Sequence, residues 1–105
     1  MNAPARPKHR KMQLVIVAEA TLEKQLVREA RERGAQSWTV SEVHGGAREG
    51  VREGRWEADR TVELKFICEP EVADAIAEHV LATHAPNYSV SLHFAEVWVL
   101  RPDRY

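Results

Sequence analysis

The sequence predicts an α+β domain in which four strands and two helices follow one another in the order βαββαβ. Two observations predict it: helical apolar spacing alternates with β-rich segments, and the second half of the chain repeats the first at an offset of 50 residues without gaps. Strands in this order form an antiparallel four-stranded sheet with both helices on one face, the ferredoxin-like arrangement. A chain of 105 residues is long enough for one such two-layer core.

The first half supplies a strand, a helix and a second strand. Residues 12–18 form a continuous apolar run that is typical of a buried strand. A helix follows over residues 22–33, with Thr21 as its N-cap and Gly34 as the residue that ends it. The apolar stripe of this helix comprises Leu22, Leu26, Val27 and Ala30. Residues 37–43, rich in Trp, Thr and Val, are predicted to form the second strand.

The second half repeats this plan. Residues 62–68 are predicted to form a strand, and Pro70 lies in the first turn of the next helix. Residues 87–100 form a long last strand with an expected bulge near Ala95–Glu96. The apolar face of the second helix comprises Val72, Ala73, Ile76, Val80 and Leu81. The offset of 50 aligns Leu14 with Leu64, Ile16 with Phe66, and Glu19 with Glu69.

Both faces of the predicted sheet carry apolar side chains. Alternation directs one set toward the helices, namely Leu14, Ile16, Leu64 and Phe66. It directs Val15, Val17 and Ile67 toward the opposite face. An antiparallel sheet with one open face normally places polar residues there, so we expect a second copy of the chain to cover it. The sequence therefore predicts a homo-oligomer.

Composition excludes several classes of protein. With 15 basic and 16 acidic residues, the chain lacks the positive field expected of a protein whose main partner is nucleic acid. No apolar run approaches the roughly 20 residues that span a bilayer. The single cysteine, Cys68, cannot form an intrachain disulfide, which favours a cytoplasmic location. Residues 1–11 are expected to be a flexible basic arm and residues 102–105 a short tail, leaving 12–101 as the domain.

The segment 45–60 between the two halves is the candidate functional loop. It holds four of the five glycines and four arginines. Glycine lets a backbone approach a ligand closely, and arginine binds phosphate or carboxylate through two parallel hydrogen bonds. An anionic ligand therefore suits this loop. The alternative interpretation is a solvated loop whose charges pair among themselves. Neither the Walker pattern nor G-x-G-x-x-G is present.

Several segments of the chain resemble the PII signalling superfamily, and in particular its PII-like branch linked to carboxysomes and bicarbonate transport. The resemblance extends over residues 12–101. It rests on Trp38-Thr39-Val40, Gly45-Gly46, Arg48, Gly50-Val51-Arg52, Ala75-Ile76-Ala77, Asn87-Tyr88 and Glu96-Val97-Trp98-Val99-Leu100. It implies a non-enzymatic homotrimer that binds AMP, ADP, ATP or cyclic AMP in clefts between subunits, with bicarbonate as a co-effector. It also implies that loop 45–60 becomes ordered and docks on a membrane transporter or a carboxysome-linked protein, in the cytoplasm or at the carboxysome.

The same resemblance assigns roles to individual residues. Gly45 and Gly46 would approach the nucleotide at the base of the loop. Arg48 and Arg52 would bind phosphate or bicarbonate. The short loop before the last strand would close the same cleft, and it comprises Asn87, Tyr88 and Ser89. Arg101, at the end of that strand, would reach a ligand held by the adjoining subunit.

The sequence gives less support to metal binding or catalysis. The five histidines are scattered, no H-x-x-x-H pair lies on one helix face, and the cysteine has no C-x-x-C partner, so no metal site is predicted within the chain. Two alternatives remain: a metal-binding trimer of the divalent-cation tolerance type, with metal at the subunit clefts, and a slow nucleotide hydrolase. The acids near enough for hydrolysis are Glu49, Glu53, Glu57 and Asp59.

A few further residues have structural interpretations. Cys68 is expected to be a small buried residue, and Glu19 and Glu69 to stabilise equivalent strand-to-helix turns. Lys65 is expected to pair with a carboxylate such as Glu63 or Glu96, or else to bind phosphate. Trp38 and Trp98 are expected to pack within the protein, whereas Trp56 lies in the loop and could dock on a partner.

Overall fold

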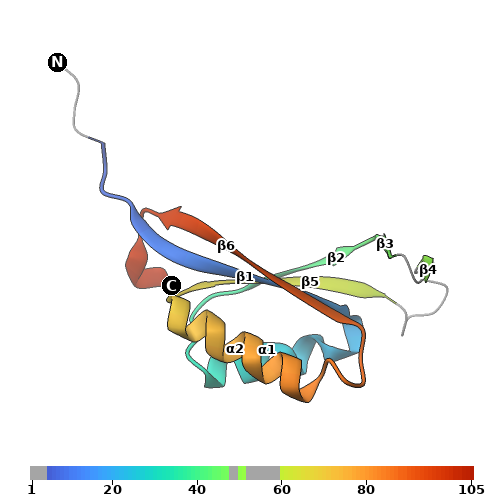
Figure 1. Cartoon of the computed structure of the whole chain (residues 1–105). Helices are drawn as coiled ribbons and strands as arrows, with labels where there is room; N and C mark the ends of the chain where they lie inside the picture. The colour runs from blue at the N-terminus through green and yellow to red at the C-terminus, as the bar shows by residue number, and fades with distance from the viewer. Residues whose placement is uncertain (1–4, 48–49, 52–59) are drawn as a thin grey trace.

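The computed structural model describes residues 5–47, 50–51 and 60–105. It contains a four-stranded antiparallel sheet with the strand order β2-β5-β1-β6, and α1 and α2 cover one of its faces (Figure 1). The predicted βαββαβ arrangement is confirmed. The main elements are β1 (His9–Glu19), α1 (Glu23–Glu32), β2 (Thr39–Val43), β5 (Thr61–Cys68), α2 (Pro70–Thr83) and β6 (Val90–Val99). Short strands β3 (Gly46–Ala47) and β4 (Gly50–Val51) pair with each other, and 3₁₀ helices η1 (Ala20–Leu22) and η3 (Pro102–Arg104) complete the chain.

Strand β1 is hydrogen-bonded along both of its edges. It pairs with β5 from Met12 opposite Cys68 to Glu19 opposite Thr61. On its other side it pairs with β6 in one unbroken register. The predicted bulge at Ala95–Glu96 was therefore wrong. Because β6 lies at the edge of the sheet, polar Glu96 can stay exposed on it without breaking the pairing.

The core lies between the sheet and the helices, as the 50-residue repeat predicted. The two repeat-related pairs of β1 and β5 face each other crosswise in the ladder: Leu14 lies opposite Phe66, and Ile16 lies opposite Leu64. All four side chains are fully buried. The helices contribute Leu26, Ala30, Ala73, Ile76 and Val80 to the same core. Burial of these side chains is the main term that stabilises the fold.

The start of α1 differs from the prediction. Thr21 is exposed inside η1, and the N-cap of α1 is Leu22, which makes no side-chain capping bond. The chain leaves the sheet at Glu19 in an extended conformation (φ −63°, ψ 139°), and the repeat-related Glu69 has nearly the same one (φ −63°, ψ 148°). The helical turn therefore begins directly after the strand, before Thr21 can act as a cap. The predicted end at Gly34 is confirmed, since its φ of 114° is one that glycine adopts without strain.

The face of the sheet opposite the helices is mixed in character. Val15 is buried there at 3% exposure, and Val17 and Ile67 are half-buried. In the register of the sheet, Val15 lies between Lys65 on β5 and His93 on β6, both exposed. The Lys65 ammonium lies 3.4 Å from the Glu63 carboxylate, which confirms the predicted pairing. The apolar part of this face is thus a narrow strip along β1.

Three residues predicted to pack inside the chain are exposed. Leu81 is 49% exposed because it lies about 100° around α2 from the buried Val80. Trp98 is 63% exposed on the edge strand β6. Trp38, 37% exposed, packs instead against the Arg31 guanidinium, which lies 5.3 Å from the ring centroid.

Among the described residues, no helix is long and apolar enough to cross a membrane.

Substitutions in α2 test this division between core and surface. Ile76→Ala removes a side chain that is only 2% exposed, and it should lower the free energy of unfolding by about 2–4 kcal/mol. Leu81→Ala, on the same helix, should lower it by less than about 1 kcal/mol. Urea unfolding at one fixed protein concentration measures both, and equal losses would contradict the packing described.

Candidate functional site

The predicted ligand loop begins directly after β2. Gly45 is exposed, and a Cβ atom placed on it would meet nothing within 4 Å. Packing against the described residues therefore does not require glycine at this position. Gly46 begins the β3–β4 hairpin, in which Gly46 pairs with Val51 and Ala47 with Gly50. The sequence had predicted a loop over residues 45–60 and no strand within it. Arg48, Arg52, Trp56 and the loop acids Glu49, Glu53, Glu57 and Asp59 lie outside the described residues.

The second predicted segment, 87–89, forms a tight turn between α2 and β6. The backbone N–H groups of Asn87 and Tyr88 both donate to the carbonyl oxygen of His84, at 3.0 and 2.9 Å. The N–H of Ser89 donates to Oε2 of Glu19 at 2.9 Å. Since Glu19 ends β1, its carboxylate fixes the turn to the sheet, which supports the structural role expected of this residue. All three residues of the turn are exposed.

Both segments lie at the same end of the sheet. At this end Val43 of β2 is opposite Thr61 of β5, and Thr61 is opposite Glu19 of β1. Val90, the first residue of β6, is opposite Ala18 of β1. Because β2 and β6 are the two edge strands, their ends are separated by three strand spacings, about 14 Å. Gly45 and Ser89 thus flank one end of the sheet without touching.

Arg101 lies at the opposite end. The strand β6 runs ten residues from Val90 to Val99, so Arg101 is about 30 Å along the sheet from the turn at Ser89. Figure 1 shows this separation: the C-terminus lies at the other end of the sheet from β3 and β4. The side chain of Arg101 is exposed and borders a groove of about 630 Å³, whose lining also includes Ser37, Ile67, Val97, Arg104 and Tyr105. A single chain therefore does not bring Arg101 together with the loop residues.

A buried lysine fixes the C-terminal segment beside this groove. Lys11 is 6% exposed, and its ammonium group donates to the Glu69 carboxylate and, at 3.3 Å, to the backbone oxygen of Tyr105. Glu69 thus has the structural role that the repeat predicted. The adjacent Cys68 is buried, and burial together with the Glu69 charge raises the pKa of its thiol to about 11. Such a thiol is protonated at neutral pH and is not a nucleophile.

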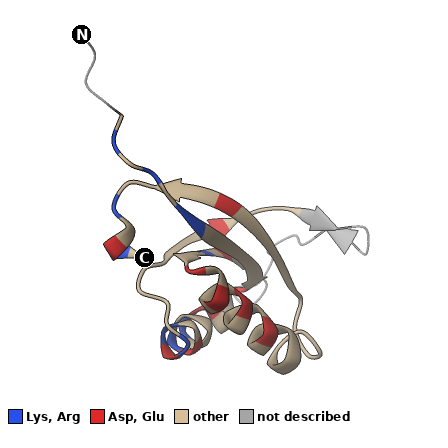
Figure 2. Ribbon diagram, turned by 60° about the vertical axis from the view of Figure 1, so that its left-hand side comes forward, with Lys and Arg blue, Asp and Glu red and all other residues tan. Residues whose placement is uncertain are grey.

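Charge is unevenly distributed over the described elements. Figure 2 shows basic residues along the N-terminal arm and acidic residues on the helices. The arm and the start of β1 carry Arg6, Lys8, Arg10 and Lys11, whereas α2 carries three acids and no lysine or arginine. The nearly balanced totals of 15 and 16 charged residues therefore do not describe the individual elements.

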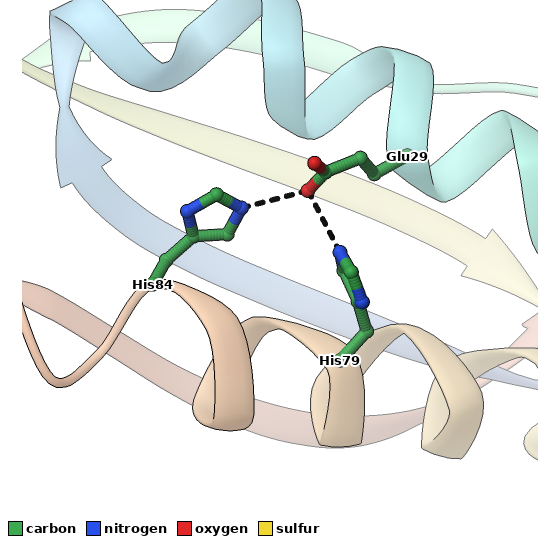
Figure 3. Close-up of side chains that lie close together, drawn as sticks. All are labelled: Glu29, His79 and His84. Carbon is green, nitrogen blue, oxygen red and sulfur yellow. Dashed lines mark hydrogen bonds and ion pairs between the residues drawn. The ribbon is translucent and has the colours of Figure 1, made fainter.

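A second cluster of polar side chains lies between the two helices and was not found from the sequence. Glu29 of α1 accepts hydrogen bonds at a single oxygen, Oε1, from Nε2 of His84 at 2.7 Å and Nε2 of His79 at 2.9 Å (Figure 3). Both histidines come from α2 or the residue that caps it. Glu29 and His84 are buried and His79 is partly buried. The ring of His84 also packs against Tyr88 of the turn, with 6.3 Å between centroids.

The hydrogen bonds define the protonation of this cluster. Arginine only donates, so the 2.8 Å contact between Arg33 Nη2 and His79 Nδ1 makes Nδ1 an acceptor and leaves the proton on Nε2, facing Glu29. Burial raises the pKa of Glu29, but hydrogen bonds from His84, Gln25 and His79 outweigh it and lower the pKa to about 2. Glu29 is therefore an ionised carboxylate at neutral pH.

The spacing of the two histidines explains why sequence analysis missed them. Residues five apart do not share one face of a regular helix, but His84 is the C-cap, where the chain has begun to turn. A signal was nevertheless present, since the offset of 50 aligns Glu29 with His79. Repeat-related positions on two paired helices can face each other, as these do. An H-x-x-x-H motif places both histidines on one helix face, whereas this cluster joins residues of two helices.

Comparison with known proteins identifies the family. The family described as nitrogen regulatory protein P-II matches residues 11–104. The chain belongs to the P-II family. A PII-like signaling protein from Thermus thermophilus is 32% identical, with a TM-score of 0.81, over 93% of this chain and 97% of its own. The predicted membership of the PII superfamily is confirmed.

Two more distant structures share the fold. CPII, a nitrogen regulatory PII-like protein from Thiomonas intermedia K12, was solved bound to ADP, AMP and bicarbonate. It is 17% identical, with a TM-score of 0.84, over 95% of this chain and 97% of its own. CutA from Synechococcus elongatus PCC7942 is 10% identical, with a TM-score of 0.63, over 91% of this chain and 87% of its own. No curated protein sequence matches the chain.

The lowered pKa of Glu29 predicts acid sensitivity. A carboxylate whose pKa falls from 4.5 to about 2 on folding contributes stability that is complete above pH 4.5 and is lost as the pH falls toward 2. The contribution is at most about 3 kcal/mol. Urea unfolding between pH 6 and pH 3 should therefore show a smaller loss of stability in Glu29→Gln than in the wild type. Glu32→Gln, an exposed position on the same helix, should follow the wild type; a Glu29→Gln curve parallel to the wild type would contradict the prediction.

Proposed function

We propose that this P-II family protein binds an adenine nucleotide, ADP or AMP, together with bicarbonate at clefts between subunits. The observation that carries the proposal is the position of the two predicted nucleotide segments, Gly45–Gly46 and 87–89, at one end of the sheet, with Arg101 at the other. The structural similarity to CPII, whose structures contain ADP, AMP and bicarbonate, supports the choice of ligand. ATP and cyclic AMP are further candidates from the same resemblance.

The local geometry supports the roles proposed for the loop residues. No described residue fills the space beside Gly45, so a ligand can approach the backbone there. The 87–89 turn is exposed, and its backbone is fixed by His84 and Glu19 before any ligand arrives. Such preorganisation reduces the ordering cost of binding. Arg48 and Arg52 are proposed to supply the bidentate contacts to phosphate or bicarbonate.

The separation of Arg101 from the loop supports a homotrimer. Arg101 can contribute to a site formed at residues 45–46 and 87–89 only if it comes from an adjoining subunit, because about 30 Å of strand lies between them in one chain. Phe94 is 45% and Trp98 63% exposed on β6, on the side of the sheet that Leu14 faces, and these side chains give a second chain apolar surface to cover. The half-buried Val17 and Ile67 add apolar surface on the opposite face.

The proposed activity is signalling without catalysis. Nucleotide and bicarbonate would order loop 45–60 and so change the surface offered to a partner. We propose that this partner is a membrane transporter or a carboxysome-linked protein of inorganic-carbon metabolism, and that the protein acts in the cytoplasm. Membership of a family of regulatory proteins supports a regulatory role.

Removal of the loop arginines tests the ligand assignment. The double variant Arg48→Ala/Arg52→Ala should bind ADP at least about tenfold more weakly than the wild type, since each charge-assisted contact contributes more than about 1 kcal/mol. Titration calorimetry with and without bicarbonate measures this change. Arg28→Ala, exposed on α1, is the matched control and should bind normally. Unchanged ADP affinity in the double variant would show that these arginines do not hold the ligand.

Mixed oligomers test the contribution of Arg101 from another subunit. Arg101→Ala and Arg52→Ala should each weaken ADP binding, while sedimentation still reports a trimer. After the two variants are unfolded and refolded together, some clefts should combine an intact loop from one subunit with an intact Arg101 from its neighbour. Recovery of sites with wild-type affinity is the expected result. No recovery in a verified mixed trimer would mean that Arg101 acts within its own chain or not at all.

A further inference from the structure

We propose that Glu29, His79 and His84 form a binding site for a divalent transition-metal ion of the Zn²⁺ class, held within a single chain between α1 and α2. The ligands would be one carboxylate oxygen and the Nε2 atoms of two imidazoles. Two histidines and one glutamate are the three protein ligands of some zinc sites that keep a fourth position for water. This inference is independent of the proposed nucleotide function.

The ligand atoms already converge. The three residues offer ligand atoms that all lie within 4.8 Å of one another, and both Nε2 atoms point at Oε1 of Glu29 (Figure 3). Tetrahedral Zn²⁺ with bonds of about 2.0–2.1 Å needs its ligands about 3.3 Å apart. The observed Oε1–Nε2 separations of 2.7 and 2.9 Å would widen by about half an ångström. The two imidazole nitrogens, which lie within 4.8 Å of each other, would be brought to the same spacing by side-chain rotation.

Neighbouring groups orient the carboxylate. Gln25 donates from Nε2 to Oε2 of Glu29 at 3.0 Å, so the other oxygen is directed at the two histidines. Arg33 donates to the backbone oxygen of Glu29 at 2.9 Å. Fixed ligands of this kind increase metal affinity, because less freedom is lost when the metal binds.

A metal bound to His79 would move the imidazole proton to its other nitrogen, and the structure contains a hydrogen-bond acceptor for it there. Coordination through Nε2 moves the imidazole proton to Nδ1. Arg33, which now donates to Nδ1 at 2.8 Å, cannot accept this proton and must turn away. The hydroxyl of Thr83 lies 3.4 Å from the same nitrogen and can accept it. Arg33 is therefore expected to compete with the metal and Thr83 to support it.

The choice of residues is hard to explain by stability alone. Leu26 and Ala30 on α1 and Val80 on α2 lie next to the cluster in the sequence and are buried in the core. Apolar residues in place of a buried charged group are often neutral or stabilising. Two histidines hydrogen-bonded to one buried carboxylate at this contact therefore suggest a chemical role.

The site is accessible from solvent on one side. The side chain of His79 is 21% exposed, compared with 12% for Glu29 and 4% for His84. An ion can therefore enter past His79, and the fourth position would take a water molecule from that side. This location differs from the subunit clefts at which the divalent-cation alternative placed a metal.

Titration of the full-length, nucleotide-free protein with Zn²⁺, and with Co²⁺ as a spectroscopic probe, tests the proposal. We expect one Zn²⁺ per chain and a Co²⁺ absorption spectrum of four-coordinate type with nitrogen and oxygen ligands. Mg²⁺ and Ca²⁺, which prefer sites built from oxygen alone, should not compete. Glu29→Gln, His79→Gln and His84→Gln should each weaken Zn²⁺ binding at least about 100-fold.

Three further variants separate metal binding from a purely structural cluster. His93→Gln, an exposed histidine on β6, should leave Zn²⁺ affinity unchanged. Arg33→Gln should tighten binding several-fold by freeing Nδ1 of His79, and Thr83→Ala should weaken it. Because Arg33, Thr83 and His79 are all partly or fully exposed, these variants should fold even if His84→Gln does not.

Two results would overturn the proposal. One is Zn²⁺ binding by the wild type that is no tighter than binding by a folded His79→Gln variant. The other is an Arg33→Gln variant that binds Zn²⁺ no more tightly than the wild type, together with a Co²⁺ spectrum of octahedral type. Neither result bears on ADP binding, so failure here would leave the proposed nucleotide function to be judged by its own tests.

Discussion

The ladders on the two edges of β1 are the constraint on which the rest of the structure depends. Each pairing directs successive β1 side chains to opposite faces of the sheet. Leu14 and Ile16 therefore lie beside Phe66 and Leu64 on the helix side, while Val15 lies on the other side. The same pairings bring the ends of β1 and β2 and the starts of β5 and β6 to one end of the sheet. A slip of one residue in either ladder would turn the apolar side chains of that strand to the opposite face and remove them from the core.

This geometry bears directly on the function proposed for the protein. An antiparallel sheet with short connections places its loops at opposite ends, and here the loop after β2 and the turn before β6 share one end while the C-terminal segment occupies the other. Residues carried by both ends can serve one ligand only across a boundary between subunits. For a regulatory protein this coupling is useful, because a ligand at the boundary senses the relative position of two chains.

The internal repeat accounts for both the core and the polar cluster between the helices. Repeat-related residues occupy equivalent places in the two halves, as the matching backbone of Glu19 and Glu69 shows. Where the equivalent residues are apolar, they build the core. At one position the pair is Glu29 and His79, so the same symmetry brings an acid and an imidazole together, and His84 completes the group from the end of α2.

Local patterns were enough to predict the βαββαβ order, the four central core residues and the end of α1 at Gly34, because periodicity and glycine conformation act over a few residues. The family likeness also came from the chain alone, through short motifs in the loops, in α2 and in the strands. Pairing and packing decided the rest. The unbroken register of β6 leaves no bulge at Ala95–Glu96, since an edge strand can expose a polar residue freely. The exposure of Trp98, the contact of His84 with Glu29 and the distance from Arg101 to Ser89 depend on where distant segments meet, which spacing along the sequence does not specify.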